Sequence, residues 1–241
     1  MVANSFGSIR IMTGVLAVAM TAASGCEKKA ASPADTAAVS AVPAGTSAAA
    51  PATPQLPPAI EALGHHSENA YDKVKLSDWA AARASVDSLA TFVVAIDSTR
   101  IAELPDEFRE SLDKLKGAIA SRSRTVALRE SNRLTSLGAR VAKAFNPVVP
   151  EAVTLLDYYG REIEIWAAAR DDAKLRETGA AIRSTWEGIR GEVASRGGTA
   201  EVARFDSLVA DVSKAKTPAQ YQRLAKPILD EVDLLEAVFK R

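Results

Sequence analysis

Between residues 59 and 241, apolar residues recur every three or four positions, and no stretch shows the strict alternation typical of a half-buried strand. This pattern predicts an all-α fold of about eight helices. Because short connections make consecutive helices antiparallel neighbours, we expect an antiparallel helical bundle. The expected helices cover residues 59–75, 77–98, 105–120, 123–145, 150–170, 172–195, 199–215 and 217–239.

Residues that commonly begin or end helices stand at these boundaries. Ser77-Asp78 and Thr217-Pro218 supply side-chain oxygens that cap a helix start, and proline suits the first helical turn. Asn146-Pro147 and Gly197-Gly198 are typical of helix ends. Pro227 predicts a kink within the last helix. Trp79, Trp166 and Trp186 are expected to anchor the core.

Sliding the chain by 94 residues aligns Glu107–Phe145 with Glu201–Phe239 without gaps. Ser123 then meets Thr217, and the same offset places Asp78 on Asp172. Matching caps and helix lengths predict two similar four-helix halves. The alternative is that any two amphipathic helical hairpins would align equally well.

The N-terminal region has a different pattern. Ile11 to Met20 form an apolar run after the single positive charge of Arg10. The run is too short to span a bilayer, which needs about 20 apolar residues, but it is typical of a signal peptide. We therefore expect residues 1–25 to be a signal peptide and residues 59–241 to form the folded domain.

Ala23-Ser24-Gly25-Cys26 follows this run and contains the only cysteine of the chain. It resembles the lipobox of bacterial lipoproteins, with Ala23 where leucine is usual. The resemblance implies cleavage before Cys26 and acylation of Cys26, which would attach the chain to a lipid bilayer. Glu27, by the same resemblance, favours the outer membrane and a domain that faces the periplasm. The alternative is ordinary secretory cleavage, with Cys26 unmodified.

Residues 27–58 contain six of the eleven prolines and no aromatic residue. Such a composition cannot bury enough apolar surface to offset the entropy of ordering the chain. The sequence therefore predicts that residues 26–58 are a lipidated cysteine followed by a disordered tether rich in alanine and proline.

Charge and composition exclude several classes of function. The 30 basic residues balance the 30 acidic ones, whereas nucleic-acid binding requires a basic patch or stripe. One cysteine excludes an intrachain disulfide. No nucleophile elbow, phosphate-binding glycine loop or dinucleotide fingerprint occurs. We therefore expect no cofactor and a non-enzymatic lipoprotein whose helical bundle binds a partner protein or a component of the cell envelope.

His65, His66 and Glu68 suggest an alternative function, metal binding. His65 and Glu68 are three residues apart on a predicted helix and would share a face, as metal ligands from facing helices do. The segment Gly64–Glu68 resembles the Gly-x-His-x-x-Glu signature of imelysin-like periplasmic proteins, although no single histidine satisfies both spacings. The simpler interpretation is a pair of surface histidines.

The segment Leu155–Trp166 contains charged residues within an apolar helical stripe. Asp157 and Arg161 are four residues apart and share a helix face. One interpretation is a polar binding cluster inside the bundle, in which Arg161 binds an anion and Asn132 is a further member of the cluster. The other is an ordinary ion pair on a solvated face, which stabilises a helix by only about 0.3–0.5 kcal/mol.

Overall fold

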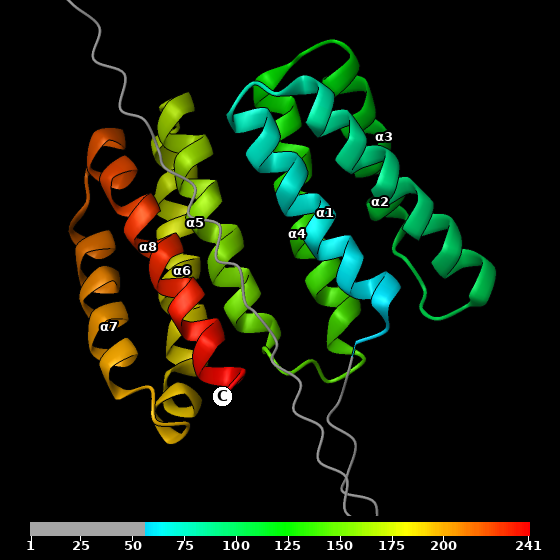
Figure 1. Ribbon diagram of the computed structural model, residues 1–241. Helices are drawn as coiled ribbons and strands as arrows, with labels where there is room; N and C mark the ends of the chain where they lie inside the picture. Colours follow the sequence, from blue (N-terminus) through cyan, green and yellow to red (C-terminus); the bar gives the residue numbers. More distant parts are fainter. Residues whose placement is uncertain (1–55) are drawn as a thin grey trace, which may run out of the picture. The chain divides into compact units, whose positions relative to one another are not determined.

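The computed structural model describes residues 56–241, and these residues form eight α-helices without any strand (Figure 1). The all-α prediction is therefore confirmed, and the helix boundaries agree with the expected ones to within a few residues. The helices are α1 (Pro58–Lys75), α2 (Trp79–Thr99), α3 (Asp106–Ala120), α4 (Arg124–Lys143), α5 (Glu151–Ala169), α6 (Asp172–Ser195), α7 (Thr199–Lys214) and α8 (Pro218–Phe239).

Side-chain caps begin three of the helices. Asp78 accepts a hydrogen bond from the backbone N–H of Ala81 at the start of α2. Asp171 accepts one from the backbone N–H of Lys174 at the start of α6. Thr217 and Gln220 form a reciprocal capping box at the start of α8. The helix then continues through Pro227 to Phe239 as one element, so the proline does not divide it.

The helices form two four-helix halves, each with its own hydrophobic core. In the first half, α1 packs against α2 and α4, and α3 packs against α4. In the second half, α5 packs against α6 and α8, and α7 lies against both α6 and α8. Contacts between α4 and α5 join the halves (Figure 1). The cores are separate clusters, one centred on Leu89, Phe108, Leu115 and Leu134, and the other on Leu156, Trp186, Phe205 and Ile228.

The halves match helix by helix, which confirms the prediction of two similar halves. Most buried positions of α1 and α2 recur in α5 and α6 at an offset of 93, and most of those of α4 recur in α8 at an offset of 94. The predicted pairing of Asp78 with Asp172 is therefore wrong by one residue. The capping side chain that matches Asp78 is Asp171, because the extra residue lies later in the repeat.

The three tryptophans differ in burial. Trp186 is only 2% exposed and packs against Phe205, with ring centroids 4.5 Å apart. Trp79 and Trp166 are partly buried and lie at the margins of the two cores. Only Trp186 is thus a central core residue.

Among the described helices, α2 alone is long and apolar enough to cross a membrane by length and composition. One face of α2, however, is buried inside the first half, through Ala82, Val86, Leu89, Val93 and Ile96. The core position of this face accounts for part of the apolar character of the helix, whereas Val94 on another face is 66% exposed.

Candidate functional site

The predicted metal-site residues of α1 have different surroundings, although the rings of His65 and His66 lie edge to face with centroids 5.2 Å apart. His65 is exposed, whereas the ring of His66 stacks on Phe92 of α2 with centroids 5.4 Å apart. Burial, followed by the charge of His65, lowers the pKa of His66. Glu68 lies two residues further on, about 200° around the helix, and faces α5 instead.

Within residues 56–241, no three or more His, Cys, Asp or Glu side chains are grouped so that they could hold a metal ion. The structure thus separates Glu68 from His66. Cys26, the predicted acylation site, lies outside the described residues.

Glu68 joins the second predicted cluster instead. Arg161 Nη2 lies 3.2 Å from Asp157 Oδ2 and 3.9 Å from Glu68 Oε2. Arg161 is 8% exposed, and its guanidinium lies over the ring of Tyr71, 5.2 Å from the centroid. Arg161 Nη1 and Asp157 Oδ2 are buried without a hydrogen bond to any described residue. A charged cluster therefore lies where α1 of one half meets α5 of the other, with Arg161 and Asp157 largely buried and the Glu68 side chain 39% exposed.

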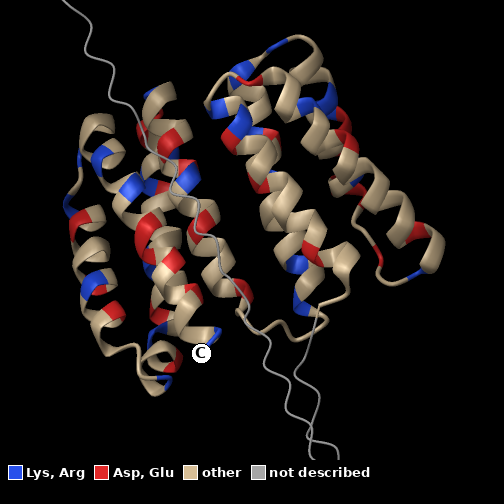
Figure 2. Ribbon diagram, in the orientation of Figure 1, with Lys and Arg blue, Asp and Glu red and all other residues tan. Residues whose placement is uncertain are grey.

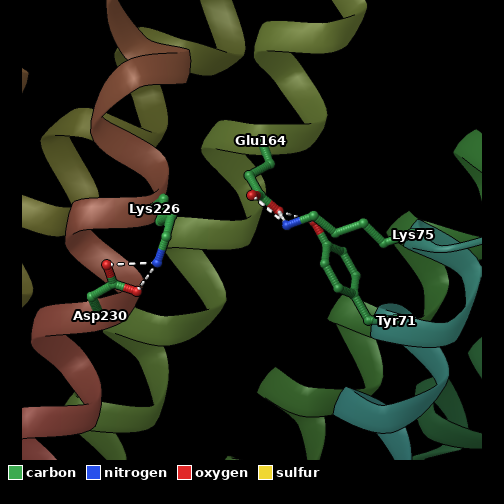
Figure 3. Close-up of polar contacts among 5 residues, drawn as sticks. All are labelled: Tyr71, Lys75, Glu164, Lys226 and Asp230. Carbon is green, nitrogen blue, oxygen red and sulfur yellow. Dashed lines mark hydrogen bonds and ion pairs between the residues drawn. The ribbon is translucent and has the colours of Figure 1, made fainter. Parts of the chain in front are cut away.

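Glu164 of α5 contacts two side chains of α1 beside this cluster (Figure 3). The hydroxyl of Tyr71 donates a hydrogen bond of 2.9 Å to Glu164 Oε2, and Lys75 Nζ lies 2.6 Å from Glu164 Oε1. Figure 3 shows Tyr71 and Lys75 projecting from α1 toward Glu164 on α5. We call Glu68, Tyr71, Lys75, Asp157, Arg161 and Glu164 the inter-half cluster.

Burial dominates the electrostatics of this cluster. It raises the pKa of Glu68 to about 7 and that of Asp157 to about 6, with the positive charge of Arg161 opposing both shifts. Burial, together with the charge of Glu164 and the hydrogen bond to it, also raises the pKa of Tyr71. Glu68 and Asp157, at the contact between the halves, are therefore expected to take up protons near neutral pH.

A pocket of about 270 Å³ opens beside the cluster, between the two halves. Its polar lining includes Tyr71 and Lys75 of α1, Arg124 of α4, Glu164 of α5 and Gln222 of α8. Leu128 and Ile165 are among its apolar residues. The combination of apolar walls with a few convergent polar groups is typical of ligand-binding pockets. We call this the inter-half pocket.

Asn132 does not join Arg161, although the two were predicted to act together. Its Nδ2 donates hydrogen bonds to the carbonyl oxygen of Tyr158 and to Glu162 Oε1, at 3.1 and 2.9 Å. Trp166 Nε1 donates to the other oxygen of Glu162. Residues 158 and 162 face α4, whereas residues 157 and 161 face α1, because one residue corresponds to a turn of 100° around a helix.

Three members of the inter-half cluster were not predicted from the sequence: Tyr71, Lys75 and Glu164. Two helical spacings could have indicated them. Glu68, Tyr71 and Lys75 are related by i, i+3 and i+7, and Asp157, Arg161 and Glu164 by i, i+4 and i+7. Each set places polar groups along one face of its helix. Neither spacing shows that the two faces meet.

Comparison of the chain with models of known protein families, with curated proteins and with solved structures found no match.

Proposed function

We propose that this protein is a lipid-anchored lipoprotein of the cell envelope whose helical domain binds a ligand or a partner in the inter-half pocket. The proposal assigns the domain a binding role and no catalytic reaction. It places the domain on the periplasmic side, with the outer membrane favoured. The observation that carries the binding role is the pocket between the halves, where exposed Lys75 and Arg124 stand beside the Tyr71–Glu164 hydrogen bond.

The arrangement of this pocket supports binding. Lys75 remains 45% exposed although it is paired with Glu164, so a ligand carboxylate or phosphate could compete for it. The pocket is bordered by helices of both halves. A bound molecule would therefore contact both halves at once and stabilise their association.

The anchor part of the proposal rests on Cys26 and the segment before it. Two or more acyl chains give stable membrane attachment, whereas one chain binds only marginally. We expect mass spectrometry of the mature N-terminus to find acylated Cys26. We also expect Cys26→Ser to move the protein from the membrane fraction to the soluble fraction. A free Cys26 thiol in a soluble mature protein would contradict the anchor.

The binding role is tested separately by photo-crosslinking in intact cells. A photoreactive amino acid at Gln222, which lines the inter-half pocket and is exposed, should give a discrete crosslinked product. The matched control is the same amino acid at Ala84, which is exposed on α2. A product at Gln222 that disappears with Lys75→Glu would support the pocket. Equal products at both positions, or none at Gln222, would contradict it.

A further inference from the structure

One face of α6 places two arginines on either side of small residues. Arg176, Gly179, Ala180 and Arg183 follow the spacing i, i+3, i+4 and i+7, which brings side chains onto the same helix face. The arginines are two turns apart, about 10 Å along the axis. Between them, this face carries no side chain larger than a methyl group. A shallow opening is thus flanked by two guanidinium groups.

The end of α7 and the start of α8 close this opening into a pocket of about 230 Å³. Arg176, Arg183 and Lys216 all line it, and Asp172 is the one carboxylate in its lining. None of the three cations forms an ion pair or a side-chain hydrogen bond with any residue in 56–241. Most exposed lysines and arginines nearby, such as Lys174 and Lys214, are paired.

Tyr221 forms part of the wall of this pocket. A Cβ atom at Gly179 would lie 3.0 Å from Val212 Cγ1, so the glycine lets Val212 approach α6 closely, and it would lie 3.7 Å from Tyr221 Oη, which places the phenol beside this face of α6. Burial raises the pKa of Tyr221, while the charge of Arg176 opposes the shift. The phenol therefore keeps its proton at neutral pH and remains available as a hydrogen-bond donor.

The corresponding positions of the first half show that helix packing does not require this set. At the offsets found above, Arg83 matches Arg176, but Val86 matches Gly179, Ala90 matches Arg183 and Ala127 matches Tyr221. The first half therefore builds the same four-helix packing without the second arginine and without the phenol. Arg122 matches Lys216 at the offset of 94, so the features that the second half adds to the shared fold are Arg183 and the phenol of Tyr221.

We propose that this α6–α8 pocket binds a phosphate group, carried by a small soluble ester or by a lipid headgroup. Arginine forks bind phosphate oxygens through paired hydrogen bonds. Three cations and one carboxylate give the pocket lining a net positive charge, which favours binding of a dianionic group. The site is separate from the inter-half pocket, and it does not depend on the function proposed above.

Titration calorimetry tests the soluble source. The full chain carrying Cys26→Ser, which removes the acylation site, is titrated with inorganic phosphate and with glycerol 3-phosphate. We expect saturable binding with one site per chain. Because hydrogen bonds to charged groups contribute about 1.5–3 kcal/mol each, Arg176→Ala and Arg183→Ala should each weaken binding about tenfold or more. Arg183→Lys should recover part of the loss.

Vesicle flotation tests the lipid source with the same Cys26→Ser chain. Vesicles of phosphatidylcholine alone are compared with vesicles that also contain phosphatidic acid. Binding only to the second kind, lost in Arg183→Ala, would assign the site to a headgroup. Binding of soluble phosphate without vesicle binding would assign it to a soluble ester.

Arg83→Ala is the matched control, because Arg83 is an exposed arginine at the equivalent place in α2. It should leave both assays unchanged. The proposal is overturned if neither phosphate nor phosphatidic acid binds. It is also overturned if Arg83→Ala weakens binding as much as Arg176→Ala does, because the effect would then come from net charge alone.

Discussion

At the scale of single residues, Arg161 is the only buried basic side chain in residues 56–241. Its side chain is 10% exposed, lies over Tyr71, and faces two carboxylates whose pKa values are raised by burial. The simpler sequence interpretation, an ion pair on a solvated face, is wrong because α1 covers this part of α5. A buried charged cluster stabilises a fold only while each charge keeps its partner.

Replacement of Arg161 by methionine should therefore be strongly destabilising at pH 7.5. The variant keeps most of the side-chain volume but leaves Asp157 buried without its cation, which costs about 3–5 kcal/mol in comparable cases. Urea denaturation measures the loss. The loss should be smaller at pH 5, where Asp157 can take up a proton.

Arg190→Met is the control for this experiment, because Arg190 pairs with Asp206 while both side chains remain substantially exposed. It should change the free energy of unfolding only slightly. Equal effects of Arg161→Met and Arg190→Met on the free energy of unfolding would show that the inter-half cluster stabilises the fold no more than an exposed ion pair does.

At the scale of helices, the packing of α5 against α8 depends on Gly160. A Cβ atom at this position would lie 2.7 Å from Leu229 Cδ2 and 3.3 Å from Ile228 Cγ2. The glycine lowers the intrinsic stability of α5, but it lets the two helices approach closely. The same α5 presents Arg161 to α1, so this contact also sets the position of the inter-half cluster.

Gly160→Ala should destabilise the protein by about 1–3 kcal/mol, because Leu229 and Ile228 must shift to admit the methyl group. Gly188→Ala in α6 is the matched control. It meets no atom within 4 Å, and it should stabilise the protein by up to about 1 kcal/mol through helix propensity. Thermal denaturation of both variants provides the measurement. A stabilising Gly160→Ala would contradict the close packing of α5 and α8.

At the scale of the whole molecule, two independently packed halves meet through a partly polar contact. Each half keeps its own apolar core. The contact between them adds buried carboxyl groups and an arginine. Figure 2 shows acidic and basic residues on helices of both halves, in line with the balanced charge of the chain. This organisation makes the contact between the halves more sensitive to pH than either core.

We expect the free energy of unfolding to fall as the pH rises from about 4 to about 7. The folded protein holds protons on Asp157 and Glu68 up to pH about 6 and about 7, whereas the unfolded chain releases them near pH 4. The stability from these groups is complete below the unfolded value and is lost as the pH passes the folded values. For Asp157 the loss is on the order of 1–3 kcal/mol.

Urea denaturation at pH 5 and pH 8 measures this dependence, and Asp157→Asn should reduce it. Glu110→Gln is the control, because Glu110 is exposed and pairs only with Lys114 on the same helix. An unchanged pH dependence in Asp157→Asn would contradict the assignment to this carboxyl group.

The separate cores also predict that one half folds alone. A fragment of residues 147–241 contains α5–α8 with all of the second core. It should give a helical circular dichroism spectrum and a cooperative thermal transition, at lower temperature than the full chain. A fragment of residues 106–200 has the same length but takes helices from both halves. It should not fold cooperatively, and the opposite result would show that the division into halves is wrong.

Sequence alone determined the features of this protein that depend on neighbours along the chain. The apolar period, the caps at Asp78 and Thr217 and the helix ends at Asn146-Pro147 and Gly197-Gly198 predicted eight helices and two similar halves, because helix formation depends on contacts three and four residues apart. The same periodicity placed Asp157 and Arg161 on one face of a helix.

Tertiary structure decided which faces meet. It placed Glu68 beside Arg161 and away from His66, and it placed Asn132 against an adjacent face of α5 that does not carry Arg161. It also brought Lys216 opposite the arginines of α6. A helical period states which residues share a face, but it contains no information on the partner helix or its rotation. Those depend on how the side chains of the whole domain pack together.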